Sequence, residues 1–351
     1  MSRFLLLLLP LLLLISCDPD SADDEQATTD NFDRQEMLAG WADNVVTPAY
    51  NEYLTQLAAL QYVWFQASGT DPRLSLADVR VTFDETYRSW QNAAPLLIDR
   101  AENFRLRERT NTYPTNTELI EENIRAGNAN LALPSQTAAQ GLPALDYLFY
   151  GPDSDNLLED PAAVAYVGEL IGTLTRLMEE VRGDFVTYRD AFVANDGNSA
   201  TASIDRAVNN YIFYYEKFLR AGKVGIPAGV FSDDPLADRV ESLYGGNSRV
   251  LFADALVASE RFFLNHGLAD YLDALNVTRD GEALSQTIRG QFAAILNQLA
   301  AIDTDFATAV RTDNTEMLRL YDELQRLTVL LKVDMLQALS INVDYVDADG
   351  D

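Results

Sequence analysis

The segment Gln140-Gly141-Leu142-Pro143-Ala144-Leu145-Asp146-Tyr147-Leu148-Phe149-Tyr150-Gly151 tells more about this chain than any other stretch. It predicts a close approach of the backbone followed by the start of a helix, because Pro143 suits the first helical position. Asp146 would then lie in the first helical turn, where the helix dipole favours an ionised carboxylate. The segment therefore predicts one charged side chain presented at a helix start, with Tyr147 and Tyr150 beside it.

Amphipathic helices are predicted on both sides of this segment. Pro48 indicates a kink or break in the first of them, and Pro161 opens a long helix that stops before the loop at 195–198. No run of alternating strand patterns with hairpin turns occurs. The predicted fold class is all-α, built from packed helical bundles. Later helices are expected at about 204–222, 249–265, 284–306 and 313–343, whereas 111–140 and 222–235 show the least helical pattern.

The first residues predict export and lipid attachment. Arg3 precedes an apolar run at 4–15 that is too short for an ordinary membrane-spanning helix. The run ends in Leu14-Ile15-Ser16-Cys17, which resembles a bacterial lipobox, so residues 1–17 are expected to be a lipoprotein signal with Cys17 lipidated. A plain secretory signal with a chance cysteine is the alternative. Residues 18–35 are polar and acidic, and they predict a disordered tether.

The charge balance limits the partners. Lys and Arg number 26 against 54 Asp and Glu, which gives a formal net charge of -28. Nucleic acid is therefore excluded as a partner, and contact with the membrane is expected only through the lipid anchor. Cations, basic peptides or a basic protein face are electrostatically permitted, although the same charge also serves simple solubility.

The inventory of reactive side chains excludes most known catalytic sites. Cys17 is the only cysteine and His266 the only histidine. Asn265-His266-Gly267 is typical of a helix C-terminus, a structural role that we favour over a catalytic triad. No zinc-protease, P-loop or dinucleotide motif occurs. No cofactor is predicted, and a metal ion would have to bind without His or Cys ligands.

Two other charged stretches favour structural interpretations. Lys332 and Asp334 interrupt an apolar run, so we expect a buried pair that links helices. Residues 344–351 are rich in Asp, but their spacing is not that of an EF-hand loop. A solvated tail is the favoured interpretation there.

Residues 140–148 resemble the signature region of the imelysin-like proteins, whose motif is GxHxxE. The similarity extends from about Met37 to the end of the chain. It implies two all-α helical domains, here 36–196 and 197–345 followed by an acidic tail at 346–351, with a site at the domain interface. Supporting similarities are Ser89-Trp90-Gln91, Asn111-Thr112-Tyr113-Pro114, Gly225-Ile226-Pro227 and Tyr345-Val346-Asp347-Ala348-Asp349-Gly350-Asp351.

The resemblance also implies a location and a chemistry. Imelysin-like proteins lie in the bacterial envelope, often as lipoproteins, and the family was named for a proposed insulin-cleaving metallopeptidase. Related members are associated with iron uptake. This chain keeps the motif's Gly as Gly141 but has Pro143 in place of His and Asp146 in place of Glu. Because Pro143 can neither coordinate a metal nor transfer a proton, the peptidase activity is not expected to carry over.

These observations favour a non-catalytic, lipid-anchored protein of the outer membrane, on its periplasmic face or at the cell surface. It would bind a ligand or an envelope protein between two helical domains, in the context of iron or nutrient uptake. A divergent peptidase with carboxylate metal ligands, of which Asp146 is the candidate, and a purely structural surface lipoprotein are the alternatives. The predicted binding residues are Pro143, Asp146 and Tyr147, with Trp90, Gln91, Tyr113, Lys223 and Pro227 as neighbours.

Overall fold

The structure is a computed structural model that describes residues 32–69, 72–98, 101, 103–265 and 267–343. The predicted signal at 1–17 with Cys17, His266 and the acidic tail at 346–351 lie outside the described residues. The predicted tether at 18–35 overlaps them only at its end. There a helix begins at Arg34, because the Asp33 side chain accepts a hydrogen bond from the backbone N–H of Glu36 at 2.8 Å and caps it.

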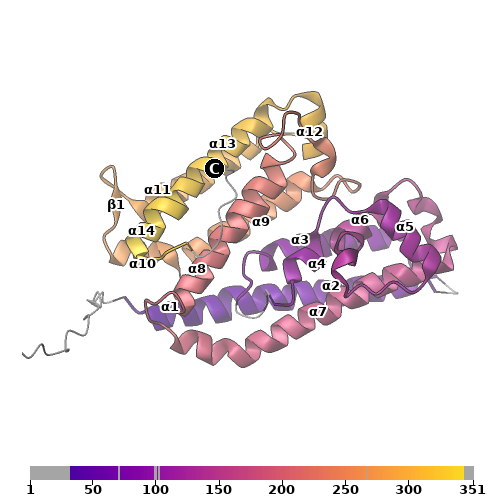
Figure 1. The fold of residues 1–351 in the computed structure, drawn as a ribbon, viewed down its shortest axis with the longest axis horizontal. Helices are drawn as coiled ribbons and strands as arrows, with labels where there is room; N and C mark the ends of the chain where they lie inside the picture. Colours follow the sequence, from indigo (N-terminus) through magenta and orange to yellow (C-terminus); the bar gives the residue numbers. More distant parts are fainter. Residues whose placement is uncertain (1–31, 70–71, 99–100, 102, 266, 344–351) are drawn as a thin grey trace, which may run out of the picture. The chain divides into compact units, whose positions relative to one another are not determined.

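Helices before residue 195 make up the first half of the described chain, coloured indigo to pink in Figure 1. A π-helical segment joins α1 to α2, and Pro48 is the second residue of α2 rather than a break in the helix. The long helix predicted at Pro161 is confirmed. The elements are α1 (Arg34–Trp41), η1 (Ala42–Val46), α2 (Thr47–Ala67), α3 (Leu76–Ala93), α4 (Leu106–Asn111), α5 (Thr117–Ala126), η3 (Pro134–Ala139), α6 (Gly141–Tyr150), η4 (Ser154–Glu159) and α7 (Pro161–Ala194).

The second half of the described chain is also helical. One antiparallel hairpin, in which Thr278 pairs with Ala283, is the only sheet among the described residues. The predicted all-α class is confirmed. The elements are α8 (Ser203–Tyr214), η5 (Tyr215–Gly225), η6 (Ala237–Arg239), α9 (Ser248–Leu264), α10 (Leu268–Ala274), β1 (Thr278–Arg279), β2 (Glu282–Ala283), α11 (Leu284–Leu299), α12 (Phe306–Thr312), α13 (Thr315–Val329), η7 (Leu330–Met335) and α14 (Leu336–Leu339).

Several expected helix ends are wrong. The helix expected to stop at Gly222 continues as π-helical η5 to Gly225. Gly222 lets η5 pack closely against Tyr113, because an added Cβ would lie 3.2 Å from the Tyr113 hydroxyl. The helix expected at 284–306 ends at Leu299, and a separate helix, α12, begins at Phe306. A helix that the pattern did not predict, α5, lies in 111–140, capped by the Asn116 side chain on the backbone N–H of Leu119 at 3.0 Å.

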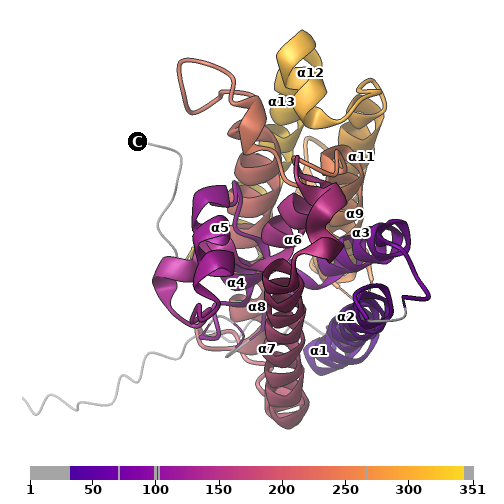
Figure 2. The same ribbon diagram turned by 90° about the vertical axis from the view of Figure 1, so that its right-hand side faces the viewer.

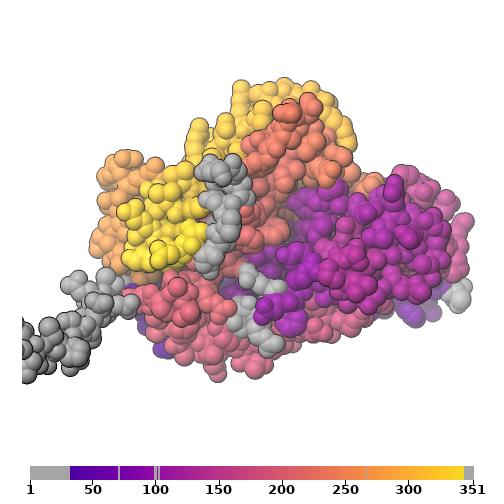
Figure 3. Space-filling model, in the orientation of Figure 1, coloured from indigo at the N-terminus to yellow at the C-terminus, as the bar shows by residue number. Residues whose placement is uncertain are grey.

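The two halves pack on each other. Figure 2 shows α3 beside α9, which are among the most extensively packed pairs of the fold, and Figure 3 shows the purple and salmon surfaces adjoining. The chain from Phe32 onward forms one compact unit, and its division at 196 into two domains stays a prediction. No helix of the described part is long and apolar enough to cross a membrane.

Lys332 and Asp334 do not pair with each other. The Lys332 ammonium contacts the Glu216 carboxylate on η5 at 3.3 Å, and Asp334 forms an ion pair with Arg279 on β1. The expectation of an ionic link between helices therefore holds for Lys332, with Glu216 as its partner. Both contacts join the C-terminal helix to neighbouring elements, which is a structural role.

Candidate functional site

The start of α6 is fixed by a glycine. Gly141 has a φ of 79°, and an added Cβ would lie 2.3 Å from the backbone oxygen of Thr110 in α4. Only glycine combines this backbone conformation with this close approach. The helix thus begins at Gly141 and not at Pro143, which is its third residue. Proline is tolerated there because the first N–H groups of a helix have no partner within it.

Asp146 lies in the second turn of α6, so the expectation of a first-turn carboxylate stabilised by the helix dipole is wrong. Its carboxylate turns to the segment 242–245 instead. The Ser242 hydroxyl donates to Oδ1 at 2.8 Å, the Tyr244 N–H donates to Oδ2 at 2.9 Å, and the Gly245 N–H donates to Oδ1 at 3.1 Å. Asp146 is only 1% exposed. It therefore joins α6 to a segment nearly one hundred residues later.

Burial raises the pKa of Asp146 from 3.8 to about 6, although the hydrogen bonds from Ser242, Tyr244 and Gly245 oppose this rise. The nearby Asp84 carboxylate raises it further. None of the three donors carries a positive charge. Asp146 is thus a buried acid that neutral groups stabilise, and its proton equilibrium falls near physiological pH.

A small cavity lies beside this carboxylate. Its volume is about 20 Å³, and Tyr113, Pro143, Asp146, Ser242 and Tyr244 line it together with neighbouring residues. A volume of this size holds about one water molecule. The cavity can accept a single small polar group, but it cannot enclose a whole metabolite.

A second polar cluster is centred on Glu241, the residue before Ser242. The Lys223 ammonium forms an ion pair with Glu241 and donates to Gln91 Oε1 at 2.9 Å. Glu241 Oε1 also accepts from Gln91 Nε2 at 3.0 Å and from Asn111 Nδ2 at 2.6 Å. Both charged side chains are almost fully buried. Burial lowers the pKa of Lys223, while the Glu241 carboxylate opposes that change.

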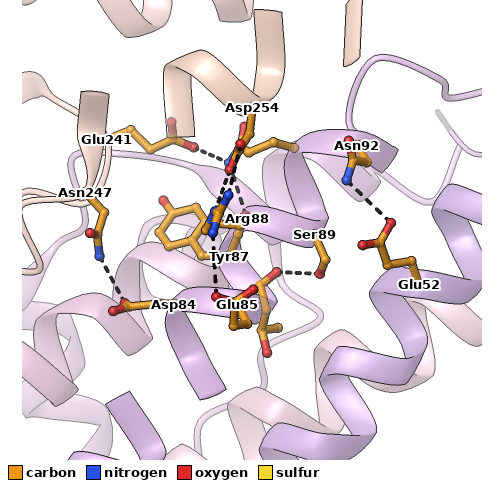
Figure 4. Close-up of polar contacts among 12 residues, drawn as sticks. Glu52, Asp84, Glu85, Tyr87, Arg88, Ser89, Asn92, Glu241, Asn247 and Asp254 are labelled. Carbon is orange, nitrogen blue, oxygen red and sulfur yellow. Dashed lines mark hydrogen bonds and ion pairs between the residues drawn. The ribbon is translucent and has the colours of Figure 1, made fainter. Parts of the chain in front are cut away.

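Helix α3 holds the remaining polar contacts of this region (Figure 4). The Asp84 carboxylate accepts from the Tyr150 hydroxyl at 2.9 Å and from Asn247 Nδ2 at 3.0 Å. Burial raises the pKa of Asp84, against the effect of these two hydrogen bonds. Arg88 donates to Asp254 of α9 at 2.8 Å. The segment 241–247 is thereby bonded to α3, α4, η5 and α6 at once.

The structure places the predicted binding residues in two groups and leaves two apart. Tyr113, Pro143 and Asp146 line the small cavity, and Tyr147 lies edge-on to Tyr244 at 5.1 Å while its hydroxyl donates to Glu121 at 3.0 Å. Gln91 and Lys223 belong to the Glu241 cluster. Trp90 instead packs in the core at 5.3 Å from Tyr53, and the Pro227 carbonyl accepts from the Leu236 N–H in a turn.

Sequence reasoning missed the segment 241–247 altogether. Glu241, Ser242 and Tyr244 supply the partners of Lys223 and Asp146, yet no periodic pattern marks them. The only local signal is Gly245-Gly246-Asn247, which is typical of a turn. An added Cβ on Gly245 would lie 2.7 Å from Asp146 Oδ1, so this glycine permits the close approach.

The residues at this site do not fit a metal ion. The Pro143 side chain has no ligand atom, and the Asp146 carboxylate is bonded to the Ser242 hydroxyl and two backbone N–H groups. Across residues 32–343, apart from the undescribed positions, no group of three His, Cys, Asp or Glu side chains could hold a metal. We therefore derive no metal-dependent step at Asp146.

Known proteins resemble this chain in sequence profile and in fold. The sequence profile of the Imelysin peptidase family matches residues 46–332. The chain belongs to the imelysin family. No curated protein matches it significantly. The segment that resembles the GxHxxE signature, with Gly141, Pro143 and Asp146 at its three fixed positions, lies at the start of α6.

Two solved structures share the imelysin fold. An imelysin-like protein from Psychrobacter arcticum 273-4 superposes with a TM-score of 0.71 at 18% identity, covering 89% of this chain and 97% of that one. A precursor from Parabacteroides distasonis ATCC 8503, named as an iron-regulated protein A, superposes with a TM-score of 0.70 at 15% identity, covering 89% and 96%. At such identities the likeness establishes the fold alone.

Proposed function

We propose that this imelysin-family chain is a lipid-anchored envelope protein that binds a ligand at Asp146 and does not cleave peptides at a metal. The observation that carries the proposal is a buried carboxylate beside a water-sized cavity, with Tyr113 and Tyr244 in its wall. Such a pocket can receive one donor group of a larger molecule. The rest of that molecule would lie outside, against the partly exposed residues around Tyr244.

The chemistry of the site favours a cationic donor. With its pKa near 6, Asp146 is mostly ionised at neutral pH, and the carboxylate can accept a fourth hydrogen bond beside its present three. The net charge of -28 attracts cations to the molecule as a whole. An ammonium group occupies about the volume of a water molecule. We therefore place an amine or a basic peptide side chain first among candidate ligands.

The biological context that we propose is nutrient acquisition at the outer membrane. The Parabacteroides relative is named as iron-regulated, and the predicted lipobox at Cys17 fits an envelope location. Iron would then control when the protein is made, and it would not be a ligand of Asp146.

A thermal-shift screen of amines and basic peptides tests the proposal. We expect at least one compound to raise the melting temperature of the wild-type chain, and Asp146→Ala to abolish that shift. Asp155→Ala is the matched control, because its carboxylate is 93% exposed and should leave the shift unchanged.

Elemental analysis and a peptide-cleavage assay on the same protein decide between the alternatives. One metal ion per chain, with chelator-sensitive cleavage lost in Asp146→Ala, would replace our proposal with the divergent peptidase. An equal ligand shift in the wild type and in Asp146→Ala would remove Asp146 from the binding site. No shift with any compound would favour the structural lipoprotein.

A further inference from the structure

Helix α2 carries two stripes of residues, one buried and one exposed. The buried stripe packs into the fold and consists of Tyr50, Tyr53, Leu57, Leu60, Trp64 and Ala67. The exposed stripe lies on the opposite side of the helix and consists of Thr55, Ala58, Tyr62 and Phe65. Its members recur at intervals of three and four residues, which places them on one face. This is the spacing with which one helix packs against another.

Two aromatic side chains extend from the exposed stripe. Phe65 is 71% exposed and Tyr62 is 63% exposed, and no large apolar side chain that the structure describes is more exposed than Phe65. The Thr55 hydroxyl donates to the Asn51 carbonyl at 2.8 Å, so its hydrogen-bonding need is met within the helix. Two exposed aromatic rings one turn apart, on a face with helix-packing spacing, are typical of a protein interface.

The exposed stripe lies in a part of α2 that has no charged side chain. Residues 53–69 include no Asp, Glu, Lys or Arg, although the whole chain has a formal net charge of -28. Two copies of such an acidic chain repel each other in most orientations. At this face they can meet without placing carboxylates opposite one another. A basic partner would find no carboxylate here to pair with, so the face fits a second copy of the same chain better.

We propose that two copies of this chain associate through α2, antiparallel, about a two-fold axis beside Tyr62. Closed two-fold dimers are the commonest assemblies of soluble proteins. In a pair centred on Tyr62, the residue three positions later faces the residue three positions earlier. Phe65 of one copy would therefore lie against Ala58 and Ala59 of the other, where the small side chains leave room for its ring.

The position of α2 in the fold permits this pairing. Figure 2 shows α2 at the edge of the first half of the chain, beside α3 and α7, which cover its buried stripe. A single pair of helices gives a small interface, so we expect a reversible dimer that dissociates on dilution. This inference is independent of the function proposed for Asp146.

Sedimentation velocity on residues 18–351, the chain expected after removal of the signal, tests the proposal. We expect a monomer at low and a dimer at high protein concentration. Added NaCl should strengthen the association, because it screens the repulsion between two acidic copies. Phe65→Glu should weaken the association at least tenfold, as the loss of a central aromatic anchor does.

Val333→Glu is the matched control for Phe65→Glu. Val333 is 54% exposed on η7, in the second half of the chain, so the variant adds the same charge away from the exposed stripe. Its dimer should be as stable as that of the wild type. A monomer at every concentration, or a dimer that Phe65→Glu weakens no more than Val333→Glu, would overturn the proposal.

A disulfide trap tests the position of the axis. Residues 18–351 contain no cysteine, so a single introduced thiol can form a disulfide only with a second copy. With an added oxidant, Tyr62→Cys should form a linked dimer at least tenfold faster than Val333→Cys, because the axis brings position 62 of both copies together. Adding Phe65→Glu should slow Tyr62→Cys to the rate of the control. Equal rates for Tyr62→Cys and Val333→Cys would contradict the proposed pairing.

Discussion

Asp146 and Glu241 are two acids that connect the same two halves of the molecule, and each is 1% exposed. They differ in what stabilises them. Asp146 accepts hydrogen bonds from a hydroxyl and two backbone N–H groups, whereas Glu241 has the Lys223 ammonium as its partner together with two amide groups. Two equally buried acids are therefore held in different ways. Neutral donors hold Asp146, and an ammonium group holds Glu241.

Removing the charged partner of Glu241 should have the largest effect. Lys223→Met leaves a buried carboxylate without a counter-charge, and breaking such a pair typically costs about 3–5 kcal/mol of unfolding free energy. Urea denaturation followed by circular dichroism measures the loss. The double variant Lys223→Met with Glu241→Gln removes both charges and should recover much of it. A single variant as stable as the wild type would show that Glu241 does not depend on Lys223.

The second largest effect is expected in the pH dependence of stability, which Asp146 should change and Glu241 should not be needed to explain. The pKa of Asp146 is raised from 3.8 to about 6 in the folded chain, so its stabilising protonation is fully present below pH 3.8 and is lost as pH rises through 6. A shift of about two units corresponds to roughly 3 kcal/mol. The unfolding free energy of the wild type minus that of Asp146→Asn should therefore fall by about this amount between pH 4 and 7.5.

Asp43 provides a control of opposite sign. The hydrogen bond from Arg189 lowers the pKa of Asp43, so its contribution is present above pH 3.8 and is lost as the pH falls through the lowered value. The difference between the wild type and Asp43→Asn should stay flat from pH 4.5 to 7.5. A similar flat difference for Asp146→Asn would show that burial does not perturb Asp146.

The sequence predicted most of the helices and named Asp146 as a site residue, but it did not predict Glu241. Pro161 and the loop at 195–198 predicted α7 correctly, because a proline start and a polar stop act locally. Gln91 was predicted as a neighbour through the family resemblance, and Lys223 was predicted as a neighbour without its partner. Glu241 was missed because its role depends on contacts with residues 91, 111 and 223, which no local periodicity encodes. The three hydrogen bonds to the Asp146 carboxylate likewise come from residues 242–245, far away in sequence.

Helix α5 shows where closer attention to caps would have helped. Asn116 stands at its N-cap, and Gly127, with a φ of 67°, stands just past its end. Both are local signals, and both were present in a stretch that the apolar pattern assigned to a loop. The segment 241–247 has no equivalent signal beyond its two glycines. Its place in the site follows from packing and not from pattern.

The smallest expected effect is at Gly245, which lies against Asp146 and not against the Lys223–Glu241 ion pair. An added Cβ would lie 2.7 Å from Asp146 Oδ1 and 3.0 Å from the Ser242 hydroxyl. Gly245→Ala should therefore push the carboxylate away from its donors and cost about 1–3 kcal/mol, as overpacking does. Gly183→Ala in α7 is the control, since its Cβ would meet nothing within 4 Å and should stabilise the helix by up to about 1 kcal/mol. Thermal melts at pH 7.5 should show a lower melting temperature for Gly245→Ala and a higher one for Gly183→Ala. Equal changes in the two variants would mean that the segment 242–245 moves without disturbing Asp146.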